Sequence, residues 1–229
     1  MKILILGSGP NVTQAATWPR TPFDSIVAIN NAWRVRDDWD YLVHPSDFPE
    51  DRQPLVLQRG QTIITHETYV PAQNALGGFV YAGGTMTFTA SYWALHQVRP
   101  SVMAYLGCDM TYGGTPSHFY GQGTADPLRN DVTLRSLEAK SARLQAIAAR
   151  QGCACINLSG DPSRLVFERG TAADLTARAV LNDAAIDHAL RLEEQAGYSV
   201  PSGKYWKEEH RFDTSVIDEI DAAWVATQA

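Results

Sequence analysis

Short apolar segments, each ended by glycine or a polar residue and separated by longer amphipathic stretches, constrain the fold of this chain most. The first, residues 2–6, is apolar after Lys2 and stops at Gly7. Continuous apolar strands are typical of parallel sheets that are buried on both faces. Because strands alternate with helical stretches, we predict an α/β fold with a doubly wound, mostly parallel Rossmann-like sheet. Its other expected strands are residues 25–30, 41–43, 63–65, 102–106 and 154–158.

From Thr171 onward the pattern changes to helix alone. We expect one long helix over 171–196, ended by Gly197, and a last helix with one apolar face. The chain is therefore expected to have a nucleotide-binding domain over 1–170 and a helical C-terminal extension over 171–229. The extension could pack on the core, complete a lid or bind a second copy of the chain in a homo-oligomer. The apolar face of the last helix carries Val216, Ile217, Ile220, Ala223 and Trp224.

Composition excludes several classes of protein. The net charge is −6, with 19 Lys+Arg against 25 Asp+Glu, and the sequence has no basic run typical of a nucleic-acid surface. No apolar stretch reaches the roughly 20 residues that a membrane-spanning helix needs. The three cysteines are odd in number, which favours free thiols and a cytoplasmic, reducing location. The histidines lack zinc-site spacing, so no metal is expected.

Polar residues gather just after the expected strands. Ligands bind open parallel sheets at the carboxyl ends of the strands, so this placement predicts a binding site at that edge. Turn chemistry alone also favours Asn, Asp and Ser at such places. The residues concerned are Asn30, Asn31, His44, Ser46, Asp47, His66, Asp109, Thr111 and Tyr112.

The turn after the first strand, Gly7-Ser8-Gly9-Pro10-Asn11, is the strongest single signal. Glycines let backbone N–H groups approach a phosphate, and a helix N-terminus favours negative charge. The turn is neither the dinucleotide fingerprint nor a P-loop, and a plain tight turn is the alternative. At the end of the strand 102–106, Asp109 could bind a cation, orient a ribose or cap a turn.

A glycine-rich loop carries Tyr112, His118 and Tyr120, with glycines at 113, 114, 121 and 123. Such a loop suits an active-site lid, although a plain surface loop is the alternative.

Together these motifs resemble the bacterial sialyltransferases of glycosyltransferase family 42, over about residues 2–165. The resemblance implies a Rossmann-like domain that binds CMP-sialic acid without a metal or other cofactor. Within it, the glycine-rich turn and the Asn after the second strand hold the nucleotide. Small residues at the start of the middle helix hold the phosphate and cytidine, and tyrosines beyond the Gly-x-Asp strand end steady the leaving phosphate. The motifs that carry it are Gly7-Ser8-Gly9-Pro10, Asn30, Pro45-Ser46, Gly83-Gly84-Thr85, Gly107-Cys108-Asp109 and Ser117-His118-Phe119-Tyr120-Gly121.

The chain departs from that family at four places. Asn11 stands where the family has Ser, His44 where it has Asn, and Thr111 where it has a tyrosine. The base of the family aligns with Gln122, and a carboxamide cannot accept a proton at neutral pH. His118 or His44 is therefore the expected base, with Tyr112 beside the leaving phosphate.

The same skeleton is also similar to hydroxymethylpterin pyrophosphokinase-like and motility-associated glycosyltransferase-like proteins. A pterin-type diphosphotransferase would use ATP and Mg²⁺, which Asp47 and Asp109 would hold. A nucleotide-binding protein without catalysis is the third hypothesis. The first hypothesis is a glycosyltransferase that takes a CMP-linked sugar and an unidentified acceptor.

Overall fold

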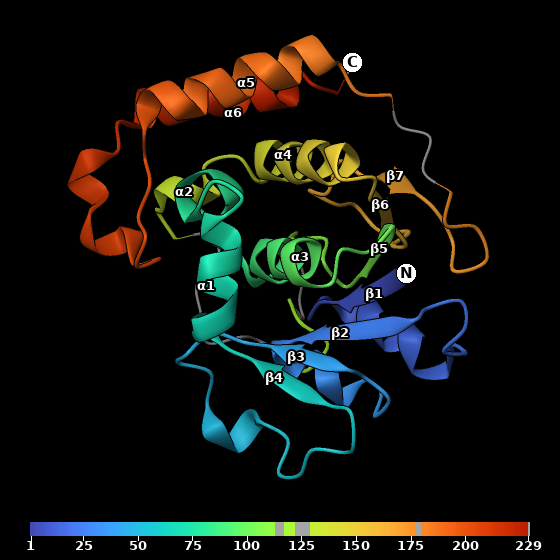
Figure 1. The fold of residues 1–229 in the computed structure, drawn as a ribbon. Coiled ribbons are helices and arrows are strands. Elements are labelled where there is room, and N and C mark those ends of the chain that lie inside the picture. Colours follow the sequence, from blue (N-terminus) through green and yellow to red (C-terminus); the bar gives the residue numbers. More distant parts are fainter. Residues whose placement is uncertain (113–116, 122–128, 177–179, 229) are drawn as a thin grey trace.

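A computed structural model describes residues 1–112, 117–121, 129–176 and 180–228. It contains a seven-stranded sheet in the order β4-β3-β2-β1-β5-β6-β7 (Figure 1), and every pair of neighbouring strands is parallel. The predicted doubly wound, mostly parallel α/β fold is therefore confirmed. The strands are β1 Lys2–Leu6, β2 Ser25–Ile29, β3 Tyr41–Val43, β4 Thr62–Ile64, β5 Val102–Leu106, β6 Ala154–Asn157 and β7 Glu168–Arg169.

Alternate residues of the central strands enter two separate apolar clusters. In β1, Ile3 and Ile5 belong to one cluster, and Leu4 and Leu6 belong to the other. All four are fully buried. Burial on both faces explains why the strand reads as a continuous apolar run instead of an alternating one.

The two faces are covered by different kinds of helix. Helices α1 (His66–Asn74), α3 (Met86–Gln97) and α4 (Leu137–Arg150) contribute to the first cluster, and the short α2 (Phe79–Ala82) joins them. The second face is covered mainly by two 3₁₀ helices, η1 (Pro10–Thr17) and η2 (Asn30–Arg34). The remaining 3₁₀ helices are η3 Glu50–Arg52, η4 Val132–Leu134, η5 Tyr205–Lys207 and η6 Glu209–Arg211.

The C-terminal extension differs from its prediction. Helix α5 runs only from Asp183 to Ala196, and residues 171–176 form an irregular segment that contains a bridge between Thr171 and Asp174. The Asn182 side chain accepts the Ala185 N–H and so begins the helix there, a cap that the prediction overlooked. Gly197, with φ 63°, ends α5 as predicted.

Helices α5 and α6 (Thr214–Val225) lie outside α4, as a third layer above the sheet (Figure 1). Buried ion pairs connect both helices to α4. Arg143 of α4 donates to both carboxylate oxygens of Glu193 at 2.7 and 2.9 Å, and Trp224 Nε1–H donates to the same carboxylate at 2.7 Å. Lys140 of α4 pairs with Asp221 of α6 at 2.7 Å. The extension therefore shares its core with the helices that cover the sheet.

No helix of the described residues is long and apolar enough to cross a membrane.

Replacing Trp224, which is 1% exposed, with alanine should lower the free energy of unfolding by about 3–5 kcal/mol. The mutation opens a cavity between α4 and α6 and removes one donor from Glu193. Urea unfolding of Trp224→Ala measures the loss, and Trp206→Ala is the control because Trp206 is 55% exposed. Equal stability of the two variants would show that the apolar face of α6 is not used.

Candidate functional site

The strand order reverses between β1 and β5, and the turns that follow these two strands lie against each other. Gly7 N–H donates to the Leu106 carbonyl at 2.9 Å, and Gly9 N–H donates to the Gly107 carbonyl at 2.8 Å. A Cβ on Gly7 would collide with the Gly107 carbonyl oxygen, and one on Gly9 would lie 2.9 Å from it. These glycines are needed for close backbone packing, and their amides are engaged within the protein.

This packing changes the interpretation of the glycine-rich turn. The sequence predicts amides that are open to a phosphate, whereas the amides of Gly7 and Gly9 already donate to β5 and its turn. Substitution of Gly9 by valine would disturb the β1–β5 junction itself, so it would not isolate a loss of ligand binding. Pro10 begins η1, where its missing N–H costs no hydrogen bond.

The Asn11 side chain, on η1, joins several polar side chains at the place where the strand order reverses. Its Nδ2 lies 2.8 Å from Asp109 Oδ2, 2.8 Å from Ser159 Oγ and 2.9 Å from Asp161 Oδ2. Ser159 Oγ–H also donates to Asp109 Oδ2 at 2.7 Å, and Asn157 Oδ1 accepts the Ser159 N–H. Asp109 therefore accepts both of these hydrogen bonds with Oδ2, and the residue is only 6% exposed.

Six buried polar atoms at this edge have no hydrogen-bond partner within the described part of the chain. They follow β1, β2, β3 and β5, four adjacent strands that together span about 14 Å. An unsatisfied buried polar group costs about 1–3 kcal/mol unless a water or a ligand supplies its partner, so a group of them at one edge makes that edge the candidate binding site. We call these residues the edge cluster. Its atoms are Ser8 Oγ, Asn11 Oδ1, Asn30 Oδ1, Asn31 Oδ1, His44 Nε2 and Asp109 Oδ1.

His44 presents a basic nitrogen in this cluster. Its Nδ1 lies 2.9 Å from the Pro45 carbonyl oxygen. A carbonyl can only accept, so Nδ1 carries the proton of the neutral ring and Nε2 keeps its lone pair. The ring is 6% exposed, and its centroid lies 5.0 Å from that of Phe48, which limits its movement. An imidazole oriented in this way can, in its neutral form, remove a proton from a bound hydroxyl.

The segment 117–121 lies over the glycine-rich turn. Phe119 N–H donates to the Ser8 carbonyl at 3.0 Å, and backbone bonds between His118 and Gly121 close a tight turn. The His118 ring centroid lies 6.3 Å from that of Tyr112 and 5.1 Å from that of Tyr120. Burial lowers the pKa of His118 and raises the pKa of Tyr112 to about 12, so both are neutral at pH 7.

The predicted lid is described only in part. Gln122 and the glycines at 113, 114 and 123 lie outside the described residues.

Other predicted site residues have roles in the local structure or lie at the surface. Asn30 adopts φ +52° where β2 turns into η2. Thr85 caps α3 by accepting the Phe88 N–H, and a Cβ on Gly84 would lie 2.5 Å from Thr133 Oγ1 and 2.7 Å from Tyr205 Oη. The remaining ones, which are exposed, are Ser46, Asp47, Thr111 and His66, the last as the first residue of α1.

Sequence reasoning missed Asn157, Ser159 and Asp161. Asn157 ends β6 and the other two follow it, so the rule that ligand-binding residues gather at strand ends would have found them. Among the described residues, no group of three or more His, Cys, Asp or Glu side chains could hold a metal ion.

In comparisons with known proteins, no family model, no curated protein and no solved structure matches the chain.

The role of Asn11 can be tested through stability. Asn11→Ala removes the donor shared by two carboxylates and should cost about 1–3 kcal/mol. Asn11→Asp should cost more at pH 7, because it adds a third carboxylate whose pKa the other two raise. A raised folded-state pKa means that this extra loss disappears below about pH 4 and is complete at neutral pH.

Urea unfolding of both variants between pH 3.5 and 8 measures this difference. Thr13→Asp, at an exposed position of η1, is the matched control. If Asn11→Asp were as stable as Asn11→Ala at every pH, Asn11 would not join the carboxylates as described.

Proposed function

We propose that the edge cluster binds a nucleotide-activated sugar and that the chain is a glycosyltransferase. The observation that carries the proposal is a pair of buried acceptors at the ends of β5 and β3, Asp109 Oδ1 and His44 Nε2, which have no partner among the described residues. A carboxylate oxygen and an imidazole lone pair call for a ligand rich in hydroxyl or amino donors. Ribose and sugar hydroxyls supply such donors, whereas a phosphate alone does not.

The length of the edge cluster supports the same class of ligand. Four adjacent strands present polar atoms over about 14 Å, which suits an elongated ligand with a nucleoside at one end and a sugar at the other. The amides of Asn30 and Asn31 can offer an oxygen or a nitrogen to the ribose or the base. The donor class that the sequence resemblance suggests, a CMP-linked sugar, fits this arrangement.

The reaction would be a displacement at the anomeric carbon. The acceptor oxygen forms a bond to that carbon, and the bond from the carbon to the phosphate oxygen breaks with its electron pair remaining on the phosphate. The hydroxyls of Ser8 and Tyr112 would stabilise the leaving phosphate. His44 Nε2 would take the acceptor proton, and His118, over the Ser8 turn, is the alternative base.

One observation favours a second candidate, a diphosphotransferase that uses Mg²⁺ and ATP. The carboxylates of Asp109 and Asp161 both reach the same nitrogen of Asn11, at 2.8 and 2.9 Å, so their oxygens lie close together. Two close carboxylates beside bound phosphates suit Mg²⁺.

The cysteines support a cytoplasmic location for this activity. Cys108, Cys153 and Cys155 are all free and buried, and burial raises the pKa of Cys108 and of Cys153 to about 12. Unpaired thiols of this kind are typical of proteins from reducing compartments.

A thermal-shift screen with CMP, CTP, UDP, GDP and ATP, each with and without Mg²⁺, distinguishes these candidates. We expect CMP to stabilise the chain without metal, and a nucleotide at 100 times its Kd adds about 2.7 kcal/mol. Asp109→Asn should reduce the shift, because the amide that replaces the carboxylate is a weaker acceptor. Glu219→Gln, on the exposed face of α6, should leave it unchanged. Stabilisation by Mg-ATP alone would favour the diphosphotransferase.

The base can be identified by comparing His44→Gln with His118→Gln. Loss of the base should lower turnover of a CMP-sugar by about 10²–10⁴ while nucleotide affinity stays nearly constant. We expect this pattern for His44→Gln and a smaller effect for His118→Gln. Transfer or hydrolysis of a labelled CMP-sugar measures turnover, and the thermal shift with CMP measures affinity. If both variants kept the parent turnover, neither histidine would be the base.

A further inference from the structure

A cavity of about 620 Å³ lies between η2 and the segment that leads into β4. Its walls include Trp33, Val35 and Trp39, which belong to the apolar cluster of the second sheet face. Pockets of roughly 300–1,000 Å³ accept small organic ligands. We call it the η2 pocket, and no function assigned above uses it.

One wall of the η2 pocket is an indole ring that the protein holds in place. Trp33 Nε1–H donates to the Arg52 carbonyl at 2.9 Å, so the ring cannot turn freely. The Arg34 guanidinium lies 5.4 Å from the ring centroid. The exposed Val56 adds an apolar side chain to the lining.

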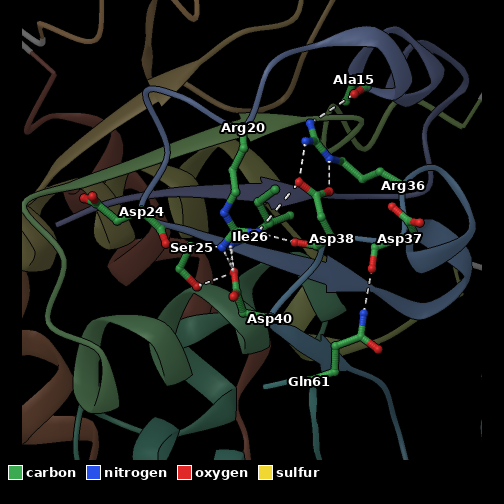
Figure 2. A network of polar contacts seen from close by, with 10 residues as sticks. All are labelled: Ala15, Arg20, Asp24, Ser25, Ile26, Arg36, Asp37, Asp38, Asp40 and Gln61. Atoms are coloured by element: carbon green, nitrogen blue, oxygen red, sulfur yellow. Dashed lines mark hydrogen bonds and ion pairs between the residues drawn. The ribbon is translucent and has the colours of Figure 1, made fainter. Parts of the chain in front are cut away.

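Hydrogen bonds also fix the polar walls (Figure 2). Arg36 binds both carboxylate oxygens of Asp38, at 2.6 and 2.8 Å, and the Ala15 carbonyl at 3.1 Å. Gln61 Nε2–H donates to the Asp37 carbonyl at 2.7 Å. The pocket therefore exists before any ligand arrives, which lowers the entropic cost of binding.

Three planar polar groups in the lining remain available. The guanidinium of Arg34, the carboxylate of Asp37 and the carboxamide of Gln58 make no hydrogen bond or ion pair within the described residues. They offer both donors and acceptors next to the indole ring. Two arginines and two aspartates line the pocket, so their charges cancel.

From these observations we infer that the η2 pocket is a binding site for a neutral saccharide. A sugar ring presents an apolar C–H face, which packs on an indole, and a rim of hydroxyls, which match planar groups that donate and accept together. A phosphorylated or otherwise strongly anionic ligand would need an excess of positive charge, which this lining lacks.

The η2 pocket is separate from the edge cluster. Its lining residues Asp38 and Trp39 lie just before β3, and Gln61 directly precedes β4, whereas the edge cluster follows the carboxyl ends of the strands. Binding of a saccharide in this pocket therefore does not depend on the proposed function.

An array of neutral, sialylated and sulfated oligosaccharides, probed with the labelled full chain and no nucleotide, tests the inference. We expect neutral oligosaccharides to be retained and Trp33→Ala to weaken the best of them at least tenfold in calorimetric titration. Asp37→Ala should weaken it several-fold without affecting folding, because this exposed carboxylate has no partner in the described part of the chain. Trp206→Ala is the control and should bind like the parent.

Retention of only anionic glycans, or of none, would overturn the inference. So would an affinity that neither Trp33→Ala nor Asp37→Ala changes. Because the array contains no nucleotide, its outcome is independent of the CMP experiment. Sugar binding without CMP binding would keep the η2 pocket and remove the proposed transferase.

Discussion

The close contact between the turns after β1 and β5 determines how the carboxyl edge of this protein is built. Because Gly7 and Gly107 meet through their backbones, no side chain fits between the two strands where their order reverses. Val12 of η1 also closes on this point, since a Cβ on Gly107 would lie 2.7 Å from its side chain. A ligand at the edge therefore meets side chains rather than the glycine amides.

This arrangement explains why the edge is rich in acceptors. The N–H groups of Gly7 and Gly9 donate to β5 and its turn, so they are not available to a ligand. The polar groups that remain at the edge are side chains, among them the hydrogen-bonded Asn11, Asp109 and Ser159. Their bonds hold one oxygen of Asp109, and the other has no partner in the described part of the chain. Acceptors of this kind match hydroxyl donors, which is why we propose a sugar nucleotide in preference to a ligand that is bound by its phosphates alone.

The two faces of the sheet are covered to different depths. On one face, α4 carries the buried Arg143 and Lys140, which hold α5 and α6 as a further layer. Breaking a buried pair by removing one partner costs about 3–5 kcal/mol, so this side is built for stability. On the other face, the thin cover of η1 and η2 leaves room for the η2 pocket. The same short helix thus begins at the edge cluster and lines the η2 pocket.

Apolar continuity and glycine positions were enough to predict much of the fold. The strand expected at 102–106 is β5, and Gly197 ends α5 as predicted. The long helix over 171–196 was wrong because the Asn182 cap decides where α5 begins. The sequence also indicated Asn11 and Asp109 as site residues, yet not that they touch each other. Contacts between turns far apart in the chain, such as Gly7 with Gly107, depend on strand order, which periodicity does not reveal.

A crystal structure of the chain with a non-hydrolysable CMP-sugar tests the central claim most directly. The account predicts the nucleotide along the carboxyl ends of β5, β1, β2 and β3. Its ribose or sugar hydroxyls should donate to Asp109 Oδ1, and His44 Nε2 should face the anomeric carbon. A nucleotide bound away from these strand ends, with Asp109 Oδ1 and His44 Nε2 still unpartnered, would contradict the account.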